Sequence, residues 1–249
     1  MIVITQNLAQ TTNTATGVRR RVRPVDRQSV SLTRMAIEKE RGFVPADGVR
    51  NRGYLFTKRA VDVLGALVLL AMLAPAMTAV FVVLTITTKG KPLFFQKRLG
   101  YQGKPFWMIK FRTMIVDADK KQAAIRNEKD GPIFKNRRDP RITPLGAFLR
   151  STSLDETPQL LSVLVGHMSL VGPRPPIAKE VAQYEWWQQR RLSVKPGLTC
   201  LWQVSGRSEI GFVDWVRMDL WYVKNQSLWT DLSLLAKTPL AVLARRGAY

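Results

Sequence analysis

The longest apolar stretch of the chain covers residues 63–88 and reads VLGALVLLAMLAPAMTAVFVVLTITT. None of its 26 residues carries a charge. The hydrocarbon core of a bilayer needs about 20 helical residues, whereas apolar runs in the core helices of soluble proteins are shorter. The stretch therefore predicts a membrane-inserted helix within residues 53–90.

Two features predict how this helix meets the membrane. Pro75 lies near the midpoint, where a proline removes a backbone hydrogen bond and bends a helix. Lys and Arg flank the stretch on both sides, although a single span has more of them on its cytoplasmic side. We expect a re-entrant helix, bent at Pro75, that enters and leaves through one leaflet; an ordinary tilted span is the alternative. Asp62 is predicted either to pair with Arg59 where the helix enters or to be an exposed first-turn acid.

The stretch before this helix, residues 1–52, is rich first in Thr, Asn and Gln and then in Arg. With few aromatic residues, it predicts a basic, disordered cytoplasmic tail, with one short helix at 31–40. The whole chain has a net charge of +21, which calls for an anionic partner such as nucleic acid, lipid headgroups or phosphorylated substrates. Residues 1–58 hold 11 Lys and Arg against four acids, so most of the excess lies beyond the tail.

The part after the helix, residues 91–249, is predicted to be a cytoplasmic α+β domain that is mainly helical with a small β-hairpin. Two strands flank a glycine-containing turn at 100–103. Helices are expected at 117–127, 153–164, 180–192, 212–222 and 231–245. The last of these is amphipathic and carries Pro239, so we expect a kinked helix that can lie at the membrane interface. The predicted fold class is thus a monotopic membrane protein with interfacial amphipathic helices.

The amino-acid composition limits the kinds of catalytic and metal-binding site that the chain can form. Cys200 and His167 are the only residues of their types, which excludes an internal disulfide framework and argues against Cys/His zinc sites and Ser-His catalysis. We expect Cys200 to be a packing residue and His167 a surface residue. Carboxylates, Lys, Arg, hydroxyls and a hard cation remain for chemistry.

The first candidate site is the acidic pair Asp155 and Glu156. Ser153 and Glu156 match the spacing of a helix capping box, which is a purely structural interpretation. However, seven Lys and Arg residues lie near this pair in a chain that is short of acids. A carboxylate at a helix N-terminus is expected to have a depressed pKa and to stay ionised. It could then attack phosphorus or hold a Mg²⁺ ion that bridges phosphate oxygens.

Two basic motifs are candidate phosphate sites. Prolines on both sides of Arg174 fix the backbone and present a forked donor suited to phosphate; a solvated connector is the alternative. In KFRT at 110–113, strand alternation places Lys110 and Arg112 on one face and packs Phe111 behind. This could be a phosphate cradle or an ordinary edge strand.

Taken together, these motifs resemble the bacterial sugar transferases, which are monotopic polyprenol-phosphate phosphoglycosyl transferases. The resemblance covers residues 56–246 and rests on ordered motifs: KRAVD at 58–62, QKRLG at 96–100, KFRTM at 110–114, SLDETPQL at 153–160, MSLVGPRP at 168–175, KPGLT at 195–199, WQVSGR at 202–207 and DLWYV at 219–223.

The resemblance implies a transferase of the exopolysaccharide-initiating type in the bacterial inner membrane, with its catalytic domain facing the cytoplasm. Asp155 would attack the β-phosphate of a UDP-sugar, UMP would leave, and undecaprenyl phosphate would collect the sugar phosphate. Glu156 would hold Mg²⁺ together with Asp155 or assist proton transfer. Substrate and phosphate binding would fall to Lys110, Arg112, Arg174, Arg207 and Asp219.

The implied partners are a UDP-sugar, undecaprenyl phosphate and membrane lipids, and they account for the +21 charge better than nucleic acid does. A hexose is expected as the sugar. An oligomer, or other polysaccharide-assembly enzymes as partners, stays open. The competing hypotheses are a membrane-anchored nucleic-acid binder and a non-catalytic membrane scaffold, but neither needs an organised acidic pair.

Overall fold

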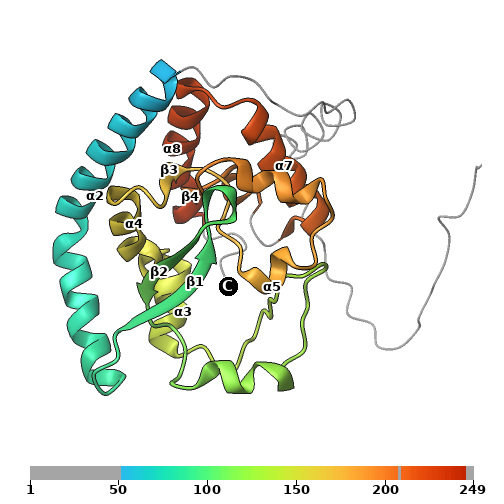
Figure 1. Ribbon diagram of the computed structural model, residues 1–249. Coiled ribbons are helices and arrows are strands. Elements are labelled where there is room, and N and C mark those ends of the chain that lie inside the picture. Colours follow the sequence, from blue (N-terminus) through green and yellow to red (C-terminus); the bar gives the residue numbers. More distant parts are fainter. Residues whose placement is uncertain (1–51, 207–208, 245–249) are drawn as a thin grey trace, which may run out of the picture.

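The computed structural model describes residues 52–206 and 209–244, leaving out the side chains of residues 123 and 124. Figure 1 shows a helical domain with one long helix along its edge. The elements, in chain order, are α2 (Arg52–Thr87), β1 (Leu93–Leu99), η1 (Tyr101–Gly103), β2 (Pro105–Phe111), η2 (Ala118–Ala124), α3 (Pro144–Ser151), η3 (Leu154–Gln159), α4 (Leu160–Leu164), β3 (Ser169–Val171), α5 (Ala178–Val181), η4 (Gln188–Ser193), β4 (Gly197–Thr199), α6 (Leu201–Ser205), α7 (Phe212–Lys224) and α8 (Leu228–Leu243). The expected tail and its helix lie outside the described residues.

The long helix α2 contains the apolar stretch and is long and apolar enough to cross a membrane. It continues through Pro75 without interruption, so the bend expected at Pro75 does not break the helix; Figure 1 shows it bowed along the domain. Its outer face leaves large apolar side chains exposed, among them Leu64, Val68 and Met72. The core helix of a soluble protein would bury these side chains. An exposed apolar face of this kind is typical of contact with lipid.

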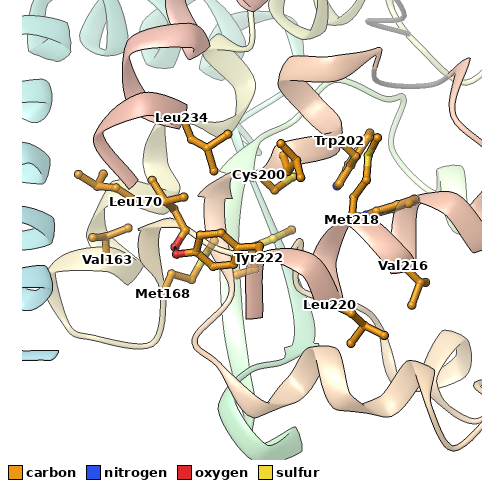
Figure 2. Packing of buried hydrophobic residues seen from close by; sticks show 14 of the residues in the cluster. Val163, Met168, Leu170, Cys200, Trp202, Val216, Met218, Leu220, Tyr222 and Leu234 are labelled. Carbon is orange, nitrogen blue, oxygen red and sulfur yellow. Dashed lines mark hydrogen bonds between the residues drawn. The ribbon is translucent and has the colours of Figure 1, made fainter. Parts of the chain in front are cut away.

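The inner face of α2 packs on the domain along most of its length. Near its start, Ala66 belongs to the main hydrophobic cluster. Near its end, Leu84 packs with Phe111 and Leu149 in a second cluster. Figure 2 shows the main cluster, which gathers Leu170 from β3, Tyr222 from α7 and Leu234 from α8. Both ends of the membrane-type helix therefore contact the same folded domain.

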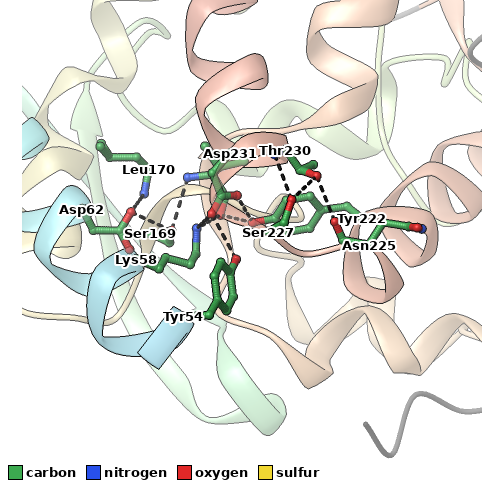
Figure 3. Close-up of polar contacts among 11 residues, drawn as sticks. Tyr54, Lys58, Asp62, Ser169, Leu170, Tyr222, Asn225, Ser227, Thr230 and Asp231 are labelled. Atoms are coloured by element: carbon green, nitrogen blue, oxygen red, sulfur yellow. Dashed lines mark hydrogen bonds and ion pairs between the residues drawn. The ribbon is translucent and has the colours of Figure 1, made fainter. Parts of the chain in front are cut away.

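A buried polar network fixes the start of α2 (Figure 3). The carboxylate of Asp231, on α8, accepts hydrogen bonds from Lys58 at 2.9 Å, Tyr54 at 3.0 Å and Tyr222 at 2.7 Å. The Lys58 ammonium also donates to the carbonyl of Val171, which ends β3. Because the two charges are buried together and hydrogen-bonded, they fix the position of α2 against β3 and α8.

Neither prediction for Asp62 is correct. Its carboxylate is buried and accepts hydrogen bonds from the Ser169 hydroxyl and the Leu170 backbone N–H, both at 2.9 Å. Arg59 instead donates to the carbonyls of Val163 and Leu164, both at 2.6 Å. Its guanidinium thus adds charged donors to the last carbonyls of α4, at the end where a helix has the fewest backbone partners.

Two small sheets complete the fold. Strands β1 and β2 form the predicted antiparallel hairpin, with Phe94 opposite Lys110. Strands β3 and β4 pair in parallel, with Ser169 opposite Gly197; this pair was not predicted, because three-residue strands leave no periodic pattern. A side chain on Gly197 would place its Cβ 2.0 Å from the backbone N of Gly172. Glycine at these two positions therefore allows the backbones around β3 and β4 to approach each other closely.

The helix predictions succeeded where the periodic apolar pattern extends over many residues. Helices α7 and α8 are confirmed, although α8 continues through Pro239. The helix predicted at 180–192 is instead the short α5 and η4, and the one predicted at 153–164 divides into η3 and α4. Helix α3, capped by Thr143 with Pro144 in its first turn, was missed.

Candidate active site

The acidic pair lies at the start of η3, directly after a residue in an unusual conformation. Ser153 has a φ of 58°, in the left-handed region, and its side chain makes no cap hydrogen bond. The capping-box interpretation is therefore wrong. A non-glycine residue in this region costs free energy, and such strain is found where the fold must aim a functional group. Here the turn leads directly into Asp155 and Glu156.

Asp155 is buried, with 6% of its surface exposed. Burial, followed by the neighbouring charge of Glu156, raises the pKa of Asp155 above its ordinary value of 3.8, against the attraction of Lys110 and Arg150. The expected depressed pKa is thus wrong, because the cost of burial exceeds the effect of the helix end. The carboxylate is a poorly solvated group that gains from nearby cations, and poor solvation favours nucleophilic attack.

A cleft beside the pair is lined by three cations together with mostly neutral residues, and it holds about 370 Å³ of space when the open solvent at its mouth is included. Its charged lining residues are Arg98, Lys110, Glu156 and Arg174. Burial and repulsion from Arg174 lower the pKa of Arg98 to about 9, and burial likewise lowers the pKa of Lys110. Burial is the main cause of both shifts and repulsion from neighbouring cations adds to it, so an anion with several charges would stabilise the charged forms of both side chains.

Buried residues behind the cleft wall hold Arg174 in its position. Its guanidinium lies 5.7 Å from the centre of the Trp215 ring, and its backbone carbonyl accepts a hydrogen bond from Arg191. Arg191 forms an ion pair with Asp219 at 2.5 Å, and both side chains are nearly inaccessible to solvent. Asp219 is therefore placed behind the cleft wall, and it supports Arg191 where a direct substrate contact had been predicted.

Arg112 is also placed away from the cleft. Its guanidinium donates to the carbonyls of Lys91 at 2.7 Å and Leu93 at 3.0 Å, at the junction between α2 and β1. The structure thus brings Lys110, Asp155, Glu156 and Arg174 together but leaves Arg112 outside. Arg207 lies outside the described residues. Phe111 is buried as predicted.

Two cations were not predicted as binding residues: Arg98, which lines the cleft, and Arg150, whose charge acts on Asp155. Arg98 donates to the Pro175 carbonyl at 2.9 Å, and Arg150 donates to the Thr113 hydroxyl at 2.9 Å. Arg98 belongs to the motif QKRLG at 96–100, and Arg150 lies just before the motif SLDETPQL at 153–160. The spacing of the motifs does not predict the direction of either side chain. Cys200 is buried and His167 is exposed, as predicted.

An apolar groove adjoins the cleft and shares Glu156, Leu198 and Gln203 with it. Its lining includes residues of α2 and α8, and it holds about 710 Å³ of space when open solvent is included. The apolar lining includes Leu69, Leu73, Leu160, Leu170, Leu235 and Val242. The groove thus connects the acidic pair with the helix that carries the lipid-type surface.

The side chains that could bind a metal ion at this site can be compared with the ligands that Mg²⁺ prefers. Among residues 52–206 and 209–244, no group of three or more His, Cys, Asp or Glu side chains is close enough to hold a metal ion. Mg²⁺ commonly binds through one or two carboxylates together with substrate phosphates and water. Asp155 and Glu156 fit this second kind of site, and they do not fit an all-protein cage.

These features define a membrane-associated protein with a buried carboxylate beside a cleft that three cations line and an apolar groove that adjoins it. The family model of the bacterial sugar transferases matches residues 53–245. The chain belongs to this family.

Curated relatives agree with that membership. The chain is 44% identical over 199 residues to the galactosyl transferase CpsE of Streptococcus agalactiae, covering 78% of this chain and 44% of the relative. It is 41% identical over 213 residues to the undecaprenyl-phosphate galactose phosphotransferase of Salmonella typhimurium, covering 82% and 44%. The chain therefore spans less than half of these two relatives. It is 38% identical to the exopolysaccharide production protein ExoY of Rhizobium meliloti over 215 residues, covering 83% of this chain and 95% of ExoY.

Proposed function

We propose that this protein transfers a hexose phosphate from a UDP-sugar to undecaprenyl phosphate in the first membrane step of exopolysaccharide assembly. The observation that carries the proposal is the buried Asp155 next to Glu156, which lines both a cleft with three cations and the apolar groove beside α2. A phosphate-bearing lipid needs both environments at once. The names of the relatives, which include an undecaprenyl-phosphate galactose phosphotransferase, support the same reaction.

The reaction would proceed in two displacements at one phosphorus. A carboxylate oxygen of Asp155 attacks the β-phosphorus of the UDP-sugar, the bond to the bridging oxygen breaks, and UMP leaves with the electron pair. A phosphate oxygen of undecaprenyl phosphate then attacks the same phosphorus, the bond to Asp155 breaks, and the carboxylate is restored. Lys110, Arg98 and Arg174 hold the phosphates and reduce the repulsion between the anionic reactants.

Mg²⁺ is proposed as the cofactor, held by Asp155 and Glu156 together with substrate phosphates. When bound, it would neutralise phosphate charge during the transfer. The proposal is tested by incubating the purified protein with undecaprenyl phosphate and separate UDP-sugars, including UDP-galactose and UDP-glucose. We expect UMP release with one hexose donor, its loss in EDTA and its return with Mg²⁺. Absence of UMP release with every UDP-sugar would contradict the proposed function.

The contacts of α2 support a re-entrant or surface-lying helix, with both ends on the cytoplasmic side. Lys58 near its start and Leu84 near its end pack on the same domain, and a folded polar domain lies on one side of a membrane. We expect cysteines introduced at Arg52 and at Lys89 to react with a membrane-impermeant maleimide only when the cytoplasmic face is exposed. Cys200 is buried and gives the low background. Labelling of one position from each side would mean a true span.

The apolar groove is proposed to hold the first isoprene units of the acceptor. Leu235 lines the groove from α8, whereas Leu232 on the same helix is about half exposed and does not line it. We expect Leu235→Gln to raise the KM for undecaprenyl phosphate about tenfold, since removing one buried leucine contact costs about 1.5–3 kcal/mol. Leu232→Gln should leave this KM unchanged.

A short-chain acceptor separates groove binding from general damage. With a prenyl phosphate too short to fill the groove, the parent and Leu235→Gln proteins should have similar KM values. An equal loss with long and short acceptors would contradict a chain-binding role for the groove.

A further inference from the structure

The cleft and the apolar groove meet at residues that line both of them. Within the described part of the chain these are Glu156, Leu198 and Gln203, and there the cleft has three cations in its lining whereas the groove has none. A phosphate attached to a chain in the groove would therefore lie at this junction. Of the three shared side chains, only that of Gln203 can donate a hydrogen bond, because a carboxylate accepts and a leucine side chain has no polar atom.

The amide of Gln203 is held by the thiol of Cys200, which donates to its Oε1 atom at 3.0 Å. Cys200 belongs to the main hydrophobic cluster (Figure 2) and directly precedes α6, of which Gln203 is the third residue. Burial raises the pKa of the Cys200 thiol well above its ordinary value, so the thiol keeps its proton and acts as the donor. The carbonyl end of the amide is thus turned toward the interior of the domain.

The opposite end of the Gln203 amide carries two N–H donors. Within residues 52–206 and 209–244, this nitrogen donates to no protein acceptor, and Gln203 is only partly buried. The orientation decides what the amide can bind, because an amide oxygen accepts from cations whereas an amide nitrogen donates to anions. With its oxygen bonded to Cys200, the amide is a donor for an anion at the junction.

A neutral donor suits this position. Glu156 lines the same junction and is proposed to hold Mg²⁺. A lysine or arginine at position 203 would form an ion pair with that carboxylate and compete with the metal ion. A glutamine amide donates to a phosphate oxygen without neutralising Glu156, and a hydrogen bond to a charged acceptor contributes more than one to a neutral acceptor.

We propose that Gln203 binds the phosphate of the acceptor lipid at this junction, and that Cys200 is the positioning residue that turns the Gln203 amide nitrogen toward it. The proposal rests on the proposed function and deepens it. A phosphate of UDP presents the same kind of oxygen atoms. Only the lipid has a chain for the groove, however, so the junction favours the lipid.

The first test is calorimetric binding to the full chain in detergent, with farnesyl phosphate in one arm and UDP in the other. Gln203→Met keeps the length of the side chain and removes both donors, so we expect it to weaken farnesyl phosphate about tenfold and to leave UDP unchanged. Gln183→Met removes a glutamine at an exposed position and should change neither affinity. Weakening of UDP by Gln203→Met, or unchanged affinity for farnesyl phosphate, overturns the proposal.

Gln203→Glu separates hydrogen-bond donation from packing. Glutamate has the shape of glutamine, but at pH 8 its ionised carboxylate cannot donate and it repels a phosphate. We expect this variant to weaken farnesyl phosphate more than Gln203→Met does. A side chain that only filled space would let the glutamate variant bind as the parent does, and that result overturns the proposal.

Variants of Cys200 test the positioning role, and they keep the proposal falsifiable if Gln203→Met does not fold. Cys200→Ser retains a donor for the Oε1 atom, whereas Cys200→Ala leaves the amide free to turn. We expect the alanine variant to bind farnesyl phosphate several-fold more weakly and the serine variant to bind it as the parent does, with the affinity for UDP unchanged in both. Equal affinities of the two variants for farnesyl phosphate overturn the positioning role.

These binding measurements distinguish the two possible failures. A parent that binds farnesyl phosphate through Gln203 but releases no UMP from any UDP-sugar would contradict the proposed reaction and leave Gln203 as a phosphate ligand. A parent that turns over normally, with Gln203→Met binding farnesyl phosphate as the parent does, would contradict only the role of Gln203.

Discussion

The Asp155→Asn protein is expected to fold and to lose turnover by at least about 10³-fold, because the attacking carboxylate oxygen is replaced by an amide. The measurement is UMP release from the UDP-hexose that the parent uses. In the absence of acceptor, mass spectrometry should find a sugar-phosphate adduct on the parent and none on the variant. Turnover at the parent rate would show that Asp155 is not the nucleophile.

The same substitution should not destabilise the protein. The pKa of Asp155 is raised above 3.8 in the folded state, so the folded state binds its proton more tightly than the unfolded state does. Ionisation therefore costs stability as the pH rises from 3.8 through the raised pKa. Asn cannot ionise, and above this window we expect an unfolding midpoint at or above that of the parent. Asp214→Asn, at a partly exposed position on α7, is the matched control and should keep full activity.

The Gly197→Ala protein is expected to lose its fold. The new Cβ would lie 2.0 Å from the backbone N of Gly172 and 2.6 Å from its Cα. Backbone cannot move aside as a flexible side chain does, so the β3–β4 pair must separate. We expect a loss of more than about 4 kcal/mol of unfolding free energy, a size reserved for a few mechanisms such as this overpacking. Thermal unfolding and the yield of monodisperse protein measure the effect.

Gly103→Ala is the control for this substitution. Gly103 has a φ of 72°, and no atom lies within 4 Å of the position that a Cβ would take there, so the variant meets backbone strain alone. The expected cost is about 1 kcal/mol. Similar unfolding midpoints for the two alanine variants would mean that the close approach of Gly172 and Gly197 is not what the fold depends on.

The helices and strands that were predicted correctly are those with a hydrophobic pattern or turn motif that extends over many residues. The apolar run of α2, the hairpin around residues 100–103 and the periodic α7 were predicted because each is encoded by many residues close in sequence. The parallel pair of β3 and β4 was not, since each strand has three residues and its partner lies far along the chain. The predicted helix at 180–192 is divided into the short α5 and η4, although its apolar residues Val181, Tyr184 and Trp187 belong to or pack against one cluster.

The candidate site divides in the same way. Residue types and their order pointed to Asp155, Glu156, Lys110 and Arg174, which the structure brings to one cleft or its edge. Direction could not be inferred, because strand alternation fixes a face but not the path of a long side chain. Arg112 consequently ends on backbone carbonyls near α2.

The sequence by itself determined the membrane-type helix, the family motifs and the residue types available for chemistry, since these depend on local composition and order. Only the tertiary structure decided that Asp155 is desolvated and that Asp219 supports Arg191 from behind the wall. The physical reason is that burial, and the charges that surround a buried group, come from residues distant in the chain.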